Sequence, residues 1–333
     1  MRTLLLPAAL VLVIAAPAAA QQDGSFTLRA NDRDDRLQLN LQYADGHSNY
    51  GRTIERSALT DVARSGDKIS FTLRREPGTF RFEGRGSIER AAGWYDFVPN
   101  TAFASELGRL GLREVDAKEL FVFALEDLSI AKVKQLQQLV SNDLDTDELV
   151  RLINHGAGVK YIQAMTDLGF KRLSSEEYRQ ARDHGVSESY VRGMADLGMK
   201  LSLDELIRTR DHGVTPDYVR AIREAGFKVD HDELVRARDH GVTPDFLKRI
   251  RGFGYDRLTL GEYIRMRDHG VTPDYVEAIR AEGLKDLSSD DLVRLRDHGV
   301  TANYVRRVKE LFKESPSVDQ IIRLRSRGDI GSR

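Results

Sequence analysis

The chain has 333 residues, no cysteine, and 51 basic against 52 acidic side chains. Without cysteine it has no disulfide, no thiolate metal ligand, no thiol nucleophile and no cysteine for a lipid anchor. Positive and negative side chains are interleaved rather than grouped in blocks, and this balance argues against nucleic acid as a partner. The apolar content of 41% is sufficient for a packed core.

Residues 1–20 have the pattern of a secretory signal peptide. Arg2 supplies the positive start, residues 4–16 form an apolar run, and Ala18 to Ala20 provide a small-residue cleavage site. The run is interrupted by proline and is shorter than the roughly 20 residues that a membrane-spanning helix requires. We therefore expect a periplasmic or secreted protein with no transmembrane segment after cleavage.

Residues 21–99 are expected to form a small antiparallel β-domain. Leucines alternate with polar side chains in residues 37–43, as in a half-buried strand. Two apolar segments surround a Pro-Gly turn in residues 69–82, which predicts a hairpin. With the apolar positions at 26–28 and 94–97, the pattern predicts about five strands in a sandwich or a barrel.

Residues 100–333 are expected to form an α-helical solenoid, so the predicted fold class is α+β. Histidines spaced 28 or 29 residues apart mark the repeat: His155, His184, His212, His240, His269 and His298. A capping box precedes each histidine and a glycine follows it, which predicts one short helix. Pairs such as Thr215-Pro216 then start a second helix. Each unit is therefore an αα-hairpin, with degenerate or half units at both ends of the stack.

Most units carry Arg-Asp-His at the end of the first helix. A histidine there gains from the helix dipole, whereas an aspartate costs about 0.3–1 kcal/mol unless a donor offsets it. We therefore predict a structural ladder along one edge of the solenoid, in which arginines pair with the aspartates across layers. Its residues are Arg182, Asp183, His184, Arg210, Asp211, His212, Arg238, Asp239, His240, Arg267, Asp268, His269, Arg296, Asp297 and His298.

Two further features have structural explanations. An aromatic side chain recurs at helical spacing in the second helix, which favours a core position over a carbohydrate-stacking strip; its members are Tyr161, Tyr190, Tyr218, Phe246, Tyr275 and Tyr304. Layers about 8–10 Å apart are too distant for successive histidines to share a zinc ion, whose nitrogen ligands lie about 2.0–2.1 Å away. We expect no metal site and no cofactor.

Enzyme signatures are missing from the sequence. It contains no His-Glu-x-x-His, no Gly-x-Ser-x-Gly and no Gly-x-x-x-x-Gly-Lys phosphate loop. One Ser-x-x-Lys occurs, from Ser129 to Lys132, and it coincides with an expected helix cap, which accounts for the serine. We expect no catalytic residues.

The repeat resembles that of a known group of proteins. The segment RDHGVTPDYV (residues 210–219) and its counterparts across residues 143–313 are similar to repeats in periplasmic extensions of bacterial BlaR-like antirepressor metallopeptidases and in exported proteins of unknown function. FTLRREPGTFRFEGRG (residues 71–86) is similar to a β-segment that precedes such repeats. The resemblance implies an envelope repeat module. Nothing matches the membrane helices or zinc motif of the peptidase, so proteolysis is not implied.

These observations favour a non-enzymatic exported interaction or scaffold protein that binds a protein or peptide partner of the cell envelope on a solenoid face. Stacked hairpins present long rows of like residues, and charged side chains on the second helix suit polar recognition. The candidate partner-binding residues are Arg220, Arg223, Glu224 and Arg249. The alternative is an envelope sensor in which the repeated Asp-His positions respond to pH or metal.

Overall fold

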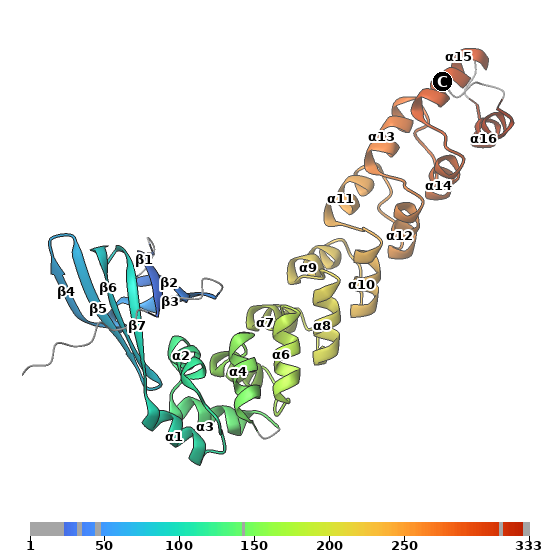
Figure 1. Cartoon of the computed structure of the whole chain (residues 1–333). Coiled ribbons are helices and arrows are strands. Elements are labelled where there is room, and N and C mark those ends of the chain that lie inside the picture. Colours follow the sequence, from blue (N-terminus) through green and yellow to red (C-terminus); the bar gives the residue numbers. More distant parts are fainter. Residues whose placement is uncertain (1–22, 32–34, 44–47, 142–143, 313–315, 329–333) are drawn as a thin grey trace, which may run out of the picture. The chain divides into compact units, whose positions relative to one another are not determined.

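The computed structural model describes residues 23–31, 35–43, 48–141, 144–312 and 316–328, and shows seven strands followed by sixteen α-helices (Figure 1). This confirms the predicted α+β chain with a β-region ahead of a helical region. The proposed signal peptide lies outside the described residues. The chain divides into two compact units, residues 1–159 with 172–175 and residues 160–171 with 176–333.

The strands of the first unit form one antiparallel sheet in the order β3-β2-β1-β7-β6-β5-β4. Their bounds are β1 Gly24–Ala30, β2 Arg36–Tyr43, β3 Asn49–Glu55, β4 Leu59–Ser65, β5 Lys68–Arg75, β6 Gly78–Ser87 and β7 Arg90–Pro99. A short 3-10 helix, Arg56–Ala58, links β3 to β4.

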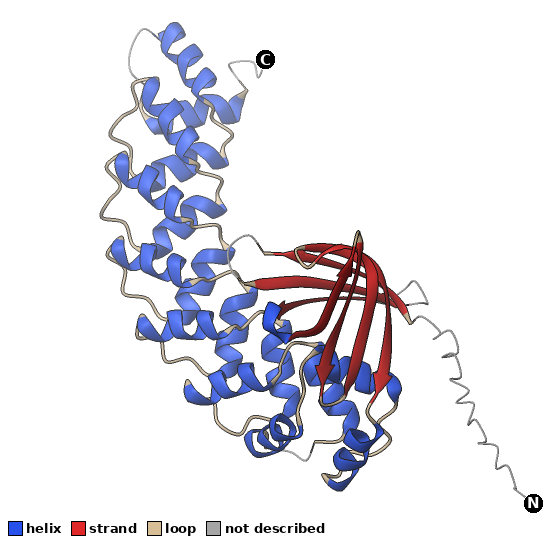
Figure 2. Cartoon of the chain, turned by 90° about the vertical axis from the view of Figure 1, so that its left-hand side faces the viewer, coloured by secondary structure: helices blue, strands red, loops and turns tan. Residues whose placement is uncertain are grey.

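The sheet curls around its own apolar face (Figure 2). The rings of Phe26 on β1 and Phe71 on β5 lie 5.4 Å apart, although β7 and β6 separate these strands. In a flat sheet three strand spacings would put them roughly 14 Å apart. Gly84 and Gly93 face each other across β6 and β7, where a Cβ on Gly84 would meet a carbonyl oxygen at 2.3 Å. Of the two expected arrangements, a single curled sheet is nearer to a barrel than to a stacked sandwich.

The sheet has seven strands rather than about five, because β3 and β4 lack the alternation that reveals a half-buried strand. On β3 Ile54 is the single buried position, and on β4 it is Leu59. These are the terminal strands in the sheet order. The burial of β3 does alternate, but one of its inward positions is Arg52, and β4 is exposed after Leu59, so neither strand carries a clear period-two apolar signal in its sequence.

The first helices complete the core of the same unit. They are α1 Thr101–Arg109, α2 Ala117–Leu125, α3 Ile130–Leu139 and α4 Thr146–Asn154. Helix α2 packs on β6 and β7, and the ring of Phe121 lies within 5.2–6.1 Å of five rings from the sheet: Tyr43, Tyr50, Phe80, Tyr95 and Phe97. Glu126 ends this helix, in the slot that histidine occupies in later units, and forms an ion pair with Arg52 of β3.

The second unit is a two-layered stack of helices (Figure 1). Its helices are α5 Val159–Asp167, α6 Ser175–Asp183, α7 Glu188–Asp196, α8 Leu203–Asp211, α9 Pro216–Glu224, α10 His231–Asp239, α11 Pro244–Gly252, α12 Leu260–Asp268, α13 Pro273–Ala281, α14 Ser289–Asp297, α15 Ala302–Phe312 and α16 Val318–Arg327. Even-numbered helices contact even-numbered ones, and odd-numbered helices contact odd-numbered ones. We call these the A layer and the B layer.

Local signals set the helix ends as predicted. Both halves of the capping box are present at the start of α8, α10, α12, α14 and α16. The side chain of Thr215 accepts from the backbone N–H of Tyr218 at the start of α9. Gly213 adopts φ +70°, the left-handed conformation that ends the preceding helix. Of the helices in the described ranges, none is long and apolar enough to cross a membrane.

Candidate functional site

The histidine and aspartate of the repeat motif meet across successive hairpins of the A layer. In four successive units the histidine Nδ1 lies within hydrogen-bond distance of an Oδ1 in the next unit: His184 and Asp211 at 2.8 Å, His212 and Asp239 at 2.7 Å, His240 and Asp268 at 2.5 Å, and His269 and Asp297 at 2.7 Å. Because a carboxylate only accepts, Nδ1 carries the donated proton. The structure therefore forms a ladder in which Asp211, Asp239, Asp268 and Asp297 each accept a hydrogen bond from the histidine of the preceding unit.

The arginine of the motif stacks on an aromatic ring instead of pairing with the aspartate. Its guanidinium carbon lies 5.1–5.3 Å from the ring centroid of the preceding B-layer helix in six pairs: Arg182 and Tyr161, Arg210 and Tyr190, Arg238 and Tyr218, Arg267 and Phe246, Arg296 and Tyr275, and Arg325 and Tyr304. Such cation–π contacts contribute about 0.5–2 kcal/mol each. The aromatic column therefore belongs to the core and is held there in part by these cation–π contacts.

The arginine–aspartate pairing that we expected inside the motif is therefore replaced by two separate contacts. Asp183 pairs within its own helix, where Arg179 Nη1 lies 3.0 Å away. Arginines four positions before the histidine reach aspartates at the start of the next A-layer helix; Arg208 lies 2.7 Å from Asp232, Arg294 lies 2.5 Å from Asp319, and Arg265 contacts Asp290. Sequence spacing shows that an arginine is available but not which carboxylate faces it.

The phenols of the aromatic column bond to the next hairpin. Tyr218 donates to the carbonyl of Val242 at 3.0 Å, and Tyr161, Tyr190 and Tyr275 make the same bond to the valine of the following motif. Burial raises the pKa of Tyr161 and of Tyr218 to about 12, because the phenolate would lose its hydration. All seven residues of Arg-Asp-His-Gly-Val-Thr-Pro thus have a structural use.

The ladder offers little for metal coordination. Within the described ranges no group of three or more histidine, aspartate or glutamate side chains is arranged to hold a metal ion. The ladder carboxylates and imidazoles remain accessible, with His212 40% and Asp239 43% exposed. Chemically, the arrangement orients a row of imidazoles with one nitrogen committed to a carboxylate.

The four candidate partner-binding residues of the B layer have different surroundings. Arg220 pairs with Asp217 in its own helix at 2.6 Å. Arg249 pairs with Asp274 of the next B-layer helix at 2.5 Å. Glu224 is exposed at the end of α9. Arg223 turns inward, where it donates to the carbonyl of Leu197 and lies 3.0 Å from the sulfur of Met199, so its guanidinium is occupied.

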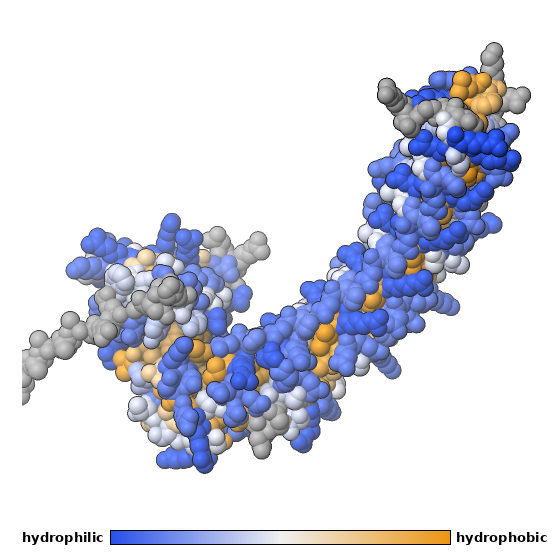
Figure 3. All heavy atoms as spheres, turned by 45° about the vertical axis from the view of Figure 1, so that its right-hand side comes forward, coloured by the Kyte–Doolittle hydropathy of each residue, from blue (hydrophilic) through white to orange (hydrophobic). Residues whose placement is uncertain are grey.

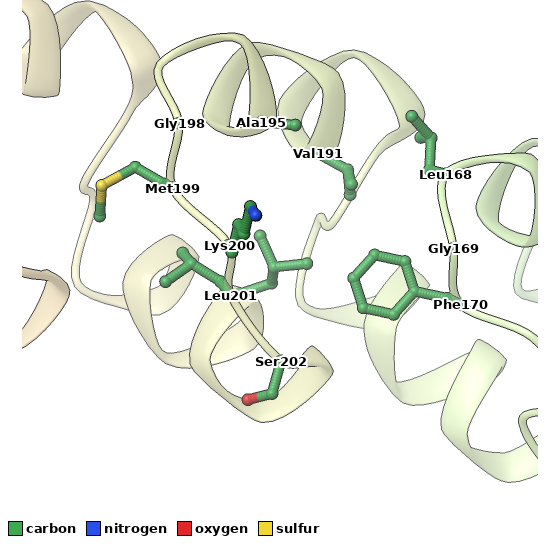
Figure 4. Close-up of a pocket in the computed structure, with 11 residues that line it drawn as sticks. Leu168, Gly169, Phe170, Val191, Ala195, Gly198, Met199, Lys200, Leu201 and Ser202 are labelled. Carbon is green, nitrogen blue, oxygen red and sulfur yellow. The ribbon is translucent and has the colours of Figure 1, made fainter.

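A pocket that sequence reasoning missed lies between the loops that follow α5 and α7, with a volume of about 470 Å³ (Figure 4). Leu168 and Phe170, from the loop after α5, line one side, and Met199 and Leu201, from the loop after α7, line the other. Ala195 closes it from the last turn of α7. The sequence contained a signal for this pocket, because later units carry an arginine or lysine at the position where α7 carries this alanine.

The chain was also compared with known proteins. It matches no family model and none of the curated proteins.

Proposed function

We propose that this protein is a non-enzymatic exported scaffold that binds a protein or peptide partner on a face of its helical stack. The observation that carries this proposal is that the residues of the repeat motif form contacts between neighbouring hairpins. Its histidine bonds to the aspartate of the next unit, its arginine stacks on a ring of the preceding B-layer helix, and the phenol of that ring bonds to the next valine. The repeat thus builds an array of nearest-neighbour contacts rather than a row of active sites. Binding then falls to the outer faces of the two layers.

The outer faces are suited to polar recognition. In the view of Figure 3 the surface along the helical stack is mostly hydrophilic and is interrupted by apolar patches between hairpins. Interfaces of this kind combine a polar rim with a few apolar anchors. The resemblance of the repeat to those of exported proteins supports a periplasmic or secreted location.

Photo-crosslinking along both layers tests the proposal. A photoreactive residue is placed at Asp204 of α8 in the A layer or at Glu224 of α9 in the B layer, both exposed, and at their counterparts in other units. After irradiation of cells, mass spectrometry identifies the crosslinked proteins. We expect one partner that is captured reproducibly from one layer and not from the other. If no position on either layer gives a reproducible crosslink above the unirradiated control, the proposal is wrong.

The sensor hypothesis is the second candidate, and the row of exposed His–Asp contacts is the observation that favours it. A change in the charge of these histidines would alter all four His–Asp contacts together. Thermal melting between about pH 5 and pH 8 tests it, with the four histidines of these contacts, His184, His212, His240 and His269, changed together to asparagine as the comparison. A pH dependence that is the same in both proteins would eliminate the sensor and leave the scaffold untouched.

A further inference from the structure

The B layer contains a column of cations that cap the preceding helix. Each cation lies five residues after the aromatic residue of its helix. Arg223 donates to the carbonyl of Leu197, and Arg251 donates to the carbonyl of Ala225. The column then continues with Lys309, which donates to the carbonyl of Glu282 at 2.7 Å. Carbonyls at a helix C-terminus lack intrahelical donors and carry the negative end of the dipole, so a cation is favourable there.

Arg280 belongs to the same column with different partners. Its guanidinium carbon lies 5.8 Å from the ring centroid of Phe253, and it donates to the carbonyl of Lys285 at 2.6 Å. The column therefore holds a cation at the end of the preceding helix in four successive B-layer helices, α9, α11, α13 and α15.

Helix α7 immediately precedes this column and lacks its cation, as does α5, where Thr166 stands at this position. Ala195 occupies the place of Arg223, and its methyl group cannot reach the end of α5. In the part of the chain that the structure describes, no side chain donates to the carbonyl of Leu168, which corresponds to that of Leu197. The pocket lies at this place and is lined by both Leu168 and Ala195 (Figure 4). The pocket is thus the space that a long cation fills in the next unit.

We propose that this pocket is a socket for an arginine side chain of a polypeptide partner, which occupies the place that Arg223 takes one unit later. This inference rests on the proposed binding function and names the chemistry of the partner. The guanidinium would donate to the end of α5, and its apolar stem would lie along Leu201 and Met199. A volume of about 470 Å³ falls within the range of ligand pockets, roughly 300–1,000 Å³.

The pocket favours arginine over lysine. Phe170 lines it where Met199 contacts Arg223 in the next unit, and a planar guanidinium stacks on an aromatic face better than a compact ammonium does. Lys200 also lines the pocket, but its counterpart Lys228 coexists with Arg223, so a lysine at this position is compatible with an arginine in the socket.

Methionine methyl groups provide a direct readout. The chain has 5 methionines; Met199 lines the pocket, whereas Met266 is buried in α12. Methyl-labelled protein is titrated with a capped alanine pentapeptide that carries arginine, lysine or citrulline at its centre. We expect the Met199 resonance to shift with the arginine peptide while that of Met266 stays unchanged. The neutral citrulline peptide should bind at least about tenfold more weakly, because it removes a charge-assisted bond.

Ala195→Arg supplies the decisive variant, since it fills the socket from within the chain as Arg223 does. The response of Met199 to the arginine peptide should disappear, whereas Ser189→Arg, which adds the same charge at an exposed position of α7 outside the pocket lining, should retain it. An unchanged Met266 signal verifies that both variants are folded. No shift of Met199 with the arginine peptide, equal binding of citrulline, or an unaltered response of Ala195→Arg would each overturn the socket.

The socket and the scaffold function can fail separately. A partner captured by crosslinking that Ala195→Arg loses and Ser189→Arg keeps supports the socket. If Ala195→Arg retains the partner fully, the socket is wrong and the scaffold function stands.

Discussion

The ladder predicts that a histidine and the aspartate it faces are energetically coupled. We consider His212→Ala and Asp239→Asn, whose side-chain atoms lie 2.7 Å apart and are 40% and 43% exposed. A pair this exposed contributes about 0.2–1 kcal/mol. An aspartate at a helix C-terminus costs about 0.3–1 kcal/mol when nothing offsets it. The stabilisation from the pair and the cost of the charge at the helix end are of similar size. The net contribution of Asp239 to stability in the intact ladder is therefore close to zero.

The expected order of stability follows from this balance. His212→Ala leaves the charge of Asp239 unopposed at the end of α10 and should lower local stability by about 0.5–1 kcal/mol. Asp239→Asn keeps an acceptor for the imidazole and removes the charge, so it should change little. In the His212→Ala background the same substitution should restore most of the loss. Asp245→Asn, in the first turn of α11, is the matched control and should destabilise by removing a favourable charge.

Amide hydrogen exchange is the suitable assay, because repeat arrays open locally and a single unfolding free energy is poorly defined for them. A change of 0.5–1 kcal/mol corresponds to about a two- to fivefold change in protection of α8 and α10. If His212→Ala leaves that protection unchanged, or if Asp239→Asn has the same effect in both backgrounds, the ladder contributes no coupling and our explanation of the aspartate is wrong.

Three other predictions concern deviations from the repeat and the buried phenols. Ser326 stands where an aspartate would face His298, with its Oγ 3.4 Å from Nδ1. Ser326→Asp gains a pair worth about 0.2–1 kcal/mol and places a negative charge at the end of α16 that costs about 0.3–1 kcal/mol, so amide exchange of α16 should change by less than about twofold, and a larger change would contradict this balance. Phe246→Tyr places a hydroxyl where Tyr218 bonds to the next valine and should raise the melting temperature through about 0.5–1.5 kcal/mol, whereas a lower value would show that the site cannot accept it. The buried phenols should make the stack sensitive to alkali. The folded pKa of Tyr218 is about 12, above its usual value near 10, so its contribution is complete below about pH 10 and is lost as the pH rises through 12. Helical circular dichroism that stays unchanged as the pH rises through 12 would refute this.

The helical hairpins were predictable because their signals are local. A threonine cap, a first-turn proline and a left-handed glycine act within one turn of the residues that they affect, as at Thr215, Pro216 and Gly213. The repeat period then extended these boundaries along the chain. The capping of α16 by Ser317 shows that the signal persists even in the half unit at the end.

The contacts between hairpins were not predictable in the same way. Whether Asp239 meets an arginine or a histidine depends on the rotation and shift between successive hairpins, and a period in sequence specifies neither. That geometry puts His212 opposite Asp239 and sends Arg238 to Tyr218. The strands β3 and β4 were missed for another reason, since the inward positions of β3 include Arg52 and β4 buries Leu59 alone, so neither sequence shows alternating apolar residues.

Specificity in such a stack has to reside in the positions where the units differ. Any residue shared by every unit is committed to holding neighbours together, and a partner that read only shared residues could bind in several registers shifted by one hairpin. A unique register requires a unit that differs from the rest in shape or charge. Helix α7 meets that requirement, because it adjoins the column that includes Arg223 and Arg251 but carries Ala195 at the place of the cation and has a pocket there. An arginine placed there by a partner would complete the column and would fix the register of everything else that the partner touches.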